Sequence, residues 1–214
     1  EYQKEAMERT HRWADRSLKS HRQNVDAQKT QALFGIIQGG RFEDLRKESS
    51  EFFKGAAFDG YGIGGSFSKH DLDISLKLQN SILPEEKPRH LLGIGEPEDL
   101  FVGVEHGIDT FDCVAPTRIA RTGQLYTKKG KINILNRKYI RDFSSVTEDC
   151  KCYTCINYTK AYLAHLFRSK EMLGATLAST HNLYFIVHLV KNIRQSLLND
   201  TFFTFKEEFI QSYQ

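Results

Sequence analysis

The chain has 214 residues, of which 40% are hydrophobic and 27% are charged, the composition of an ordinary globular protein. This length fits one large domain, or one domain with a small additional part. No apolar run approaches the ~20 residues that a membrane-spanning helix requires, which excludes a membrane-embedded protein of that kind.

The amino-terminal stretch and the cysteines indicate the compartment. The first two dozen residues are too charged for a secretory signal. Three of the four cysteines are crowded between positions 150 and 155, unlike a secreted disulfide framework. We therefore expect a cytoplasmic protein. The chain does not begin with methionine, so we expect residue 1 to be a cut point.

Strands and helices alternate over the first half of the chain. The first two dozen residues predict a charged helix. Four short apolar runs that end in glycine or polar residues predict buried strands, and the segments between them predict helices by their apolar spacing or by a proline at the first turn. The predicted strands cover 32–40, 58–65, 89–95 and 108–114, and the predicted helices cover 41–55 and 71–83 and begin again at Pro97.

This alternation predicts an α/β fold with a parallel sheet and crossover helices. Such folds place their active sites at the carboxyl ends of the strands, where this sequence has Gln38, Gly93 and Asp112. Four strands fit either a compact open sheet or the second half of an eight-stranded barrel. The pattern alone does not distinguish the two.

The second half of the chain has a different pattern. Apolar and polar residues alternate on both sides of a Lys-Lys-Gly turn, which predicts a β-hairpin at 123–135. Amphipathic spacing predicts two long helices at 159–179 and 181–198, and residues 202–214 predict a last short helix.

Three cysteines and a histidine have the spacing of a metal site. Cys150, Cys152, Cys155 and His181 form the pattern C-x-C-x2-C-x25-H. Three thiolates and one imidazole complete a tetrahedral Zn2+ shell with no position for water, which indicates a structural ion. His165 and His188 are alternative fourth ligands. The other interpretation is three free cysteines and an unrelated histidine.

Asp112 is the candidate catalytic carboxylate. It follows an apolar strand and precedes a turn at Pro116, so it is expected to point into the mouth of the sheet. A carboxylate so placed acts as a general base or as a nucleophile toward an anomeric carbon. Asp109 is its competitor, but it lies early in the strand. Cys113 has no histidine partner in the sequence, and buried filler is its simpler role.

Two further features concern ligands. Gln38 offers one acceptor and two donors that match a purine edge, and the adjacent glycines let a flat base approach. Between Thr117 and Arg141 there are eight basic residues and no acidic one. This segment is either a solvated loop face or a contact for a polyanion.

The motifs "FGIIQGG", "FDGYGIGG", "LLGIGEPEDL" and "GIDTFDCVAPTR", followed by the cysteine–histidine pattern, resemble the tRNA-guanine transglycosylases in order along nearly the whole chain. The family exchanges guanine at the tRNA wobble position for a 7-deazaguanine base in queuosine biosynthesis. The resemblance implies a (β/α)8 TIM-type barrel with an inserted zinc-binding subdomain and C-terminal helices. This chain would be the second half of that barrel, with barrel units at 1–122 and the hairpin, zinc subdomain and closing helices at 123–214.

The resemblance also implies roles for individual residues. Asp112 matches the family's nucleophile, which holds the ribose covalently while guanine leaves. Gln38 and Gly65 match residues that bind the base. The four residues of the metal pattern match ligands of one structural Zn2+ per chain. Two loops match contacts to the tRNA anticodon loop: Gly93, Ile94, Gly95, Glu96, Pro97, Glu98 and Asp99, and then Thr117, Arg118, Ile119, Ala120 and Arg121.

Two departures from the family pattern matter. The family's proton-transferring aspartate lies in an N-terminal half that these residues do not include, so we expect this chain alone to be inactive. The segment 64–71 differs from the usual loop that lines the pocket for the incoming base. The hairpin resembles bacterial members, which favours preQ1 over queuine.

The resemblance leaves two functions open. The leading one is a homodimeric transferase that binds tRNA, guanine and a 7-deazaguanine. The alternative is a non-catalytic tRNA-binding accessory subunit of the same family, against which the retention of Asp112 and Gln38 argues.

Overall fold

The computed structural model describes residues 1–64 and 69–213. The chain divides into two compact units, the first made of 1–95 and 99–113 and the second of 96–98 and 114–214. This division falls just before the boundary that we expect at residue 122. Among the described residues, no helix is both long and apolar enough to cross a membrane.

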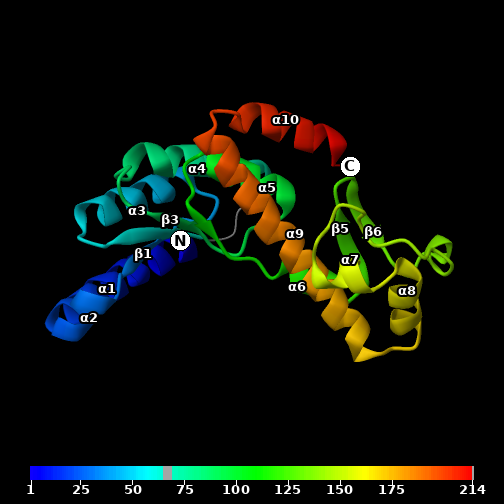
Figure 1. The fold of residues 1–214 in the computed structure, drawn as a ribbon. Coiled ribbons are helices and arrows are strands. Elements are labelled where there is room, and N and C mark those ends of the chain that lie inside the picture. Colours follow the sequence, from blue (N-terminus) through cyan, green and yellow to red (C-terminus); the bar gives the residue numbers. More distant parts are fainter. Residues whose placement is uncertain (65–68, 214) are drawn as a thin grey trace. The chain divides into compact units, whose positions relative to one another are not determined.

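The first unit is built on a four-stranded parallel sheet, which confirms the predicted α/β class. Its strands are β1 (Phe34–Ile37), β2 (Gly60–Ile63), β3 (Arg89–Leu91) and β4 (Thr110–Phe111). They lie in the order β1-β2-β3-β4, so each strand pairs with the next one along the chain (Figure 1).

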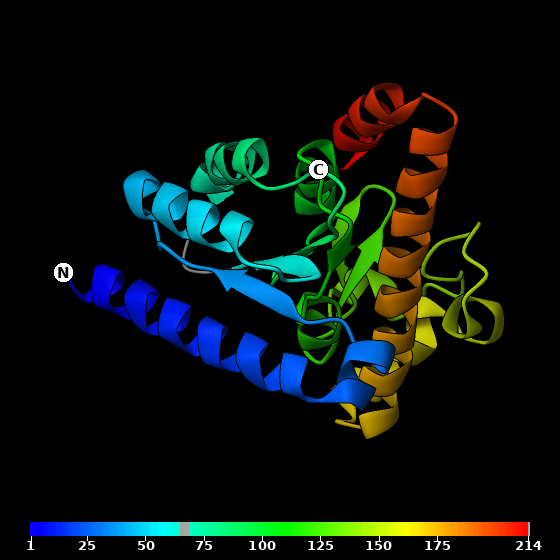
Figure 2. The same cartoon turned by 90° about the vertical axis from the view of Figure 1, so that its left-hand side faces the viewer.

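Helices of the first unit pack on one face of this sheet. They are α1 (Tyr2–Gln23), α3 (Glu43–Gly55), α4 (Lys69–Ile82) and α5 (Pro97–Glu105), while the short α2 (Val25–Thr30) contacts α1. Figure 2 shows α1 running beside β1 and α3. The predicted charged helix and the helix that begins at Pro97 are both present.

Alternate strand residues divide the sheet into a packed face and a second face. Ile37, Ile63 and Leu91 stand side by side in the strand register and join the buried cluster that includes Phe53 of α3 and Leu76 of α4. Because successive strand residues point to opposite faces, the next row, with Gly62, His90 and Thr110, lies on the other face.

One glycine of β1 is required by this packing. A side-chain carbon added at Gly35 would lie 2.4 Å from the ring of Phe53, far inside van der Waals contact. The glycine therefore lets α3 press its phenylalanine directly on the strand backbone.

The second unit contains a hairpin and helices. Its elements are α6 (Ala115–Ala120), β5 (Gln124–Thr127), β6 (Gly130–Asn133), the 3-10 turn η1 (Arg137–Tyr139), α7 (Tyr153–Asn157), α8 (Lys160–Arg168), α9 (Met172–Leu198) and α10 (Phe202–Ser212). The antiparallel pair β5–β6 confirms the predicted hairpin, and α10 confirms the last helix. A core of hairpin, α8 and α9 residues includes Leu125, Ile134, Leu163 and Leu177.

The predicted boundary between the two long helices is wrong. The chain is helical through Thr180 and breaks earlier, between α8 and α9. Lys170 has φ 57°, the left-handed conformation that ends a helix. Thr180, expected at the boundary, instead lies inside α9, and its hydroxyl donates to the carbonyl of Thr176. Hydroxyl back-bonding keeps threonine compatible with a helix interior, so α9 continues through this position.

Candidate active site and metal centre

The carboxyl edge of the parallel sheet gathers the predicted polar residues. Gln38 follows β1, Gly93 lies just beyond β3 and Asp112 follows β4. Parallel strands end at the same edge, so these residues share one rim of the first unit. Asp109 lies at the opposite end, where its Oδ2 accepts the Arg89 backbone N–H at 2.8 Å, as expected for a residue early in the strand.

Asp112 is exposed and held from one side. Its side chain is 57% exposed, and its Oδ1 accepts the backbone N–H of Gly93 and the ring Nε2 of His90, each at 3.0 Å. The Gly93 hydrogen bond lowers the pKa of Asp112 below its ordinary value; desolvation opposes this shift in part, and the hydrogen bond and charge of His90 add smaller lowering effects. Asp112 is therefore an ionised carboxylate at neutral pH.

The role of His90 was not predicted from the sequence. This histidine lies in the middle of β3, directly opposite Thr110 of β4, and its ring Nδ1 lies 2.7 Å from the threonine hydroxyl. The missing signal was register, because only the paired strands show that positions 90 and 112 are neighbours. A histidine one residue before the end of a strand was the available hint.

Of the two predicted base-binding residues, the structure describes Gln38. Gln38 is half-buried, and its backbone N–H donates to Ser49 Oγ of α3 at 3.1 Å. Gly65 lies outside the described residues. The altered segment 64–71 also lies mostly outside them.

The two predicted RNA loops differ in exposure. In the first, Gly93 and Glu98 are exposed, whereas Gly95, Pro97 and Asp99 are buried. Glu96 Oε2 accepts the Tyr126 hydroxyl at 3.1 Å and pairs with Lys131 Nζ at 2.8 Å, which fixes it to the hairpin. In the second loop, α6 and the residue after it expose Arg118 and Arg121 while Ala120 is buried; Thr117 and Ile119 are half-buried.

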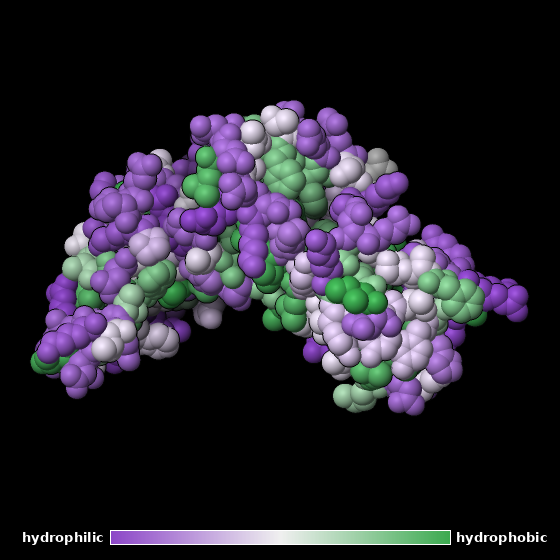
Figure 3. Space-filling view, viewed as in Figure 1, coloured by the Kyte–Doolittle hydropathy of each residue, from purple (hydrophilic) through white to green (hydrophobic). Residues whose placement is uncertain are grey.

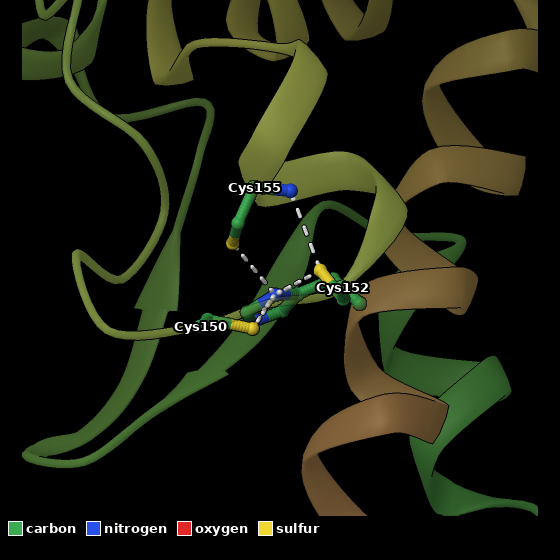
Figure 4. Close-up of side chains that lie close together, drawn as sticks. Cys150, Cys152 and Cys155 are labelled. Atoms are coloured by element: carbon green, nitrogen blue, oxygen red, sulfur yellow. Dashed lines mark hydrogen bonds between the residues drawn. The ribbon is translucent and has the colours of Figure 1, made fainter.

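The four residues of the metal pattern converge on one point. The three labelled cysteines surround one imidazole in Figure 4, and the ligand atoms of the set all lie within 4.8 Å of one another. The distances from His181 Nδ1 to the sulfurs of Cys150, Cys152 and Cys155 are 3.9, 3.5 and 3.3 Å. A tetrahedral zinc site places sulfur and nitrogen roughly 3.6 Å apart, so the geometry fits Zn2+.

Protonation in this cluster also favours a cation. Hydrogen bonds from Cys150 and then Cys155 lower the pKa of Cys152, whereas hydrogen bonds with Cys150 and Cys152 raise the pKa of Cys155. Three thiolates so close together repel one another unless a positive ion is present. His181 is fully buried and its Nε2 donates to the Tyr126 carbonyl at 2.8 Å, which leaves Nδ1 as the ligand atom.

The alternative ligands are excluded by position. His165 and His188 are exposed and do not belong to the cluster. The ring of His188 stacks on Tyr184, with ring centroids 5.7 Å apart. The four residues thus form a buried group placed to bind one metal ion, with the donor set of a structural zinc site.

Comparisons with known proteins decide the family. The family model described as queuine tRNA-ribosyltransferase matches residues 1–214. The chain belongs to this family of transferases. Three curated relatives carry the name queuine tRNA-ribosyltransferase. They come from Pediococcus pentosaceus (46% identical), Streptococcus uberis (46%) and Caldanaerobacter subterraneus (47%). Each match covers 100% of this chain and 56% of the relative, so the chain spans little more than half the length of these proteins.

Proposed function

We propose that this chain is the portion of a tRNA-guanine transglycosylase that carries the nucleophile, part of the base pocket and the zinc module. The single observation behind this proposal is the ionised, exposed Asp112 at the carboxyl edge of the sheet in a member of this family. The names of the relatives include both queuine and tRNA, and we extend that substrate class to this chain.

The proposed fold is the second half of a (β/α)8 barrel. The strands lie in sequential order, each joined to the next through a helix-bearing connection, as in a singly wound barrel. In a doubly wound sheet the strand order reverses at a switch point. The described sheet has no such reversal, which favours the barrel over an open doubly wound sheet.

The proposed reaction begins at the ribose of the wobble nucleotide. Asp112 forms a bond to C1′ while the bond from C1′ to guanine N9 breaks and its electron pair leaves with the purine, which takes up a proton. The incoming 7-deazaguanine then forms the new bond to C1′, releases a proton and frees the carboxylate. An ionised carboxylate with an open side suits the first step, because it reacts without first losing a proton.

Base and RNA contacts complete the proposal. Gln38 and Gly65 would bind the purine edge, and the exposed residues of 93–99 and 117–121 would contact the anticodon loop. The side chains of all eight basic residues between 117 and 141 are exposed, which supports contact with a polyanion. Measuring the affinity for tRNA at increasing salt concentrations tests the proposed RNA contacts. We expect a log–log slope that falls by roughly 0.7 to 0.9 for each cation removed, and a flat slope would contradict it.

We also propose a homodimer through the zinc-bearing unit. Exposed side chains of α7 and α8 include Tyr153, Ile156 and Tyr162, and Tyr158 stacks on Tyr162 with centroids 5.3 Å apart. Figure 3 shows paler and greener surface over this part of the second unit than over the purple surface of α3 and α4. Sedimentation velocity should give a dimer, and Tyr162→Glu should give a monomer.

The experiment for the enzymatic function uses an extended protein. We define it as these 214 residues preceded by the amino-terminal portion of the Pediococcus pentosaceus relative. The extended protein should incorporate labelled guanine into tRNA. The 214 residues alone should not, because the residue that we expect to protonate the leaving purine belongs to the amino-terminal portion. Asp112→Asn should abolish incorporation.

The matched control is Asp109→Asn, at the other end of the same sheet. Asparagine still accepts the Arg89 N–H there, so exchange should continue. Exchange by the Asp112→Asn protein would contradict the enzymatic proposal. Wild-type tRNA affinity with no exchange in the extended protein would favour the accessory-subunit role instead.

A further inference from the structure

His90, Thr110 and Asp112 form a connected row on the second face of the sheet. Strand alternation puts Thr110 and Asp112 on the same side of the chain, and the β3–β4 register puts His90 opposite Thr110. The imidazole spans the two residues, with Nδ1 2.7 Å from Thr110 Oγ1 and Nε2 3.0 Å from Asp112 Oδ1. Its side chain is 25% exposed, so the ring is largely enclosed.

The chemistry of the three groups assigns the protons. An ionised carboxylate only accepts hydrogen bonds, so Nε2 of His90 carries a hydrogen and donates it to Asp112. In the neutral ring Nδ1 then has a lone pair, which accepts the Thr110 hydroxyl hydrogen. Asp112 thus sets the tautomer of His90, and the Thr110 hydroxyl adapts to it and holds Nδ1 in place.

These donors distinguish the two oxygens of the carboxylate. Oδ1 accepts two hydrogen bonds, from His90 and from the Gly93 backbone. Among the described residues, no partner of Oδ2 is found within hydrogen-bond distance. Hydrogen bonds draw charge toward the donors, so the oxygen without them is the better nucleophile, and the bonds on Oδ1 fix the direction in which Oδ2 points.

We propose that His90 is a positioning residue that aims Oδ2 of Asp112 at the ribose, with Thr110 holding the imidazole in place. This inference rests on the proposed function. It predicts that removing the donor at position 90 slows the covalent step and leaves substrate binding unchanged. His90→Phe keeps an aromatic ring but has no donor, and His90→Gln places an amide N–H near the original Nε2.

The kinetic test uses the extended protein. We expect His90→Phe to lower kcat roughly 10- to 100-fold with KM for tRNA unchanged, and His90→Gln to restore most of the loss. Thr110→Val, which removes only the hydroxyl, should give an intermediate kcat. Zinc content and circular dichroism identify variants that do not fold. An equal loss of kcat in the Gln and Phe variants, or a kcat of His90→Phe equal to wild type, would overturn the proposal.

A second test needs no activity. In a 15N-histidine spectrum of the 214-residue chain, the neutral ring of His90 should be the Nε2–H tautomer, and its signals should shift in Asp112→Ala. An Nδ1–H tautomer, or His90 signals that do not change in Asp112→Ala, would overturn the inference.

Failure of the proposed enzymatic function can be distinguished from failure of the proposed role of His90. Exchange by Asp112→Asn defeats the enzymatic function, whereas loss in Asp112→Asn without loss in His90→Phe defeats only the role of His90.

Discussion

His181 and Tyr126 are joined by a hydrogen bond of 2.8 Å from the imidazole Nε2 to the backbone carbonyl. The bond fixes the tautomer of His181 and turns its Nδ1 toward the three cysteines. The next residue, Asn182, accepts the backbone N–H of the same tyrosine at 3.0 Å. Two consecutive residues of α9 therefore bind both sides of one hairpin residue and couple the metal centre to the hairpin.

The metal content of cysteine variants follows from this centre. The wild-type chain should hold one zinc ion, and Cys155→Ser or His181→Ala should hold much less, because a ligand is lost from a closed four-coordinate shell. Cys113→Ser is the matched control, since Cys113 is the one cysteine outside the cluster of described residues. Zinc release measured with a chromogenic chelator checks both. A wild-type chain without stoichiometric zinc would contradict the assignment.

Asn182→Ala should destabilise the second unit. The side chain is fully buried and accepts from Tyr126 while it donates to the carbonyls of Pro116, at 2.9 Å, and Gln124, at 3.0 Å. Its loss leaves buried backbone groups without partners, which costs about 2–3 kcal/mol. Asn192→Ala, an exposed position of the same helix, should change stability by less than about 0.5 kcal/mol. Urea unfolding measures both, and equal effects would contradict the buried role.

Local patterns were sufficient for most of the fold. Short apolar runs between helical segments predicted four strands, because a parallel sheet buried under helices requires them. The metal ligands were predictable because cysteine spacing is a local signal. His90 and Asn182 were not, since each acts on residues 20 to 66 positions away, which only the pairing of distant elements brings together.

The break between α8 and α9 could not be predicted from helix-ending residues in the sequence. Neither glycine nor proline marks it, and Lys170 adopts φ 57° there. A left-handed conformation costs a residue with a side chain about 1 kcal/mol more than glycine. The tertiary packing of the two helices overrides that cost, so propensity alone places the break at the wrong residue.

Lys170→Gly should therefore stabilise the chain by about 0.5–1 kcal/mol. The matched substitution Lys191→Gly, at an exposed position inside α9, should instead destabilise it by about 1 kcal/mol, because glycine is a poor helix former. Urea unfolding of the two variants compares them directly. Destabilisation by both substitutions would show that the turn at 170 does not need the left-handed conformation.

The pH dependence of Asp112 follows from its hydrogen bonds. Its pKa should lie below the ordinary value of 3.8, and His90→Phe should raise it, with the Gly93 bond keeping part of the depression. A depressed carboxyl pKa stabilises the fold above the unfolded value, and this contribution disappears as pH falls through the folded pKa. The contribution is small because the side chain is exposed.

Carboxyl carbon shifts measured by NMR across pH 2–6 check this titration. Asp142 is the internal control, because Ser144 and, to a smaller extent, Lys160 lower its pKa, neither of which His90→Phe touches. Its midpoint should stay constant in the variant. If the midpoint of Asp112 is the same in His90→Phe, the 3.0 Å contact from His90 Nε2 does not stabilise the ionised carboxylate.

A search for a covalent intermediate on Asp112 tests directly whether this carboxylate is the nucleophile. The extended protein is incubated with tRNA and without free base, denatured, digested and mapped by mass spectrometry. We expect a ribose-linked nucleotide on the peptide that contains Asp112, absent from Asp112→Asn and retained in Asp109→Asn. An adduct on another residue, or steady exchange by Asp112→Asn, would contradict it.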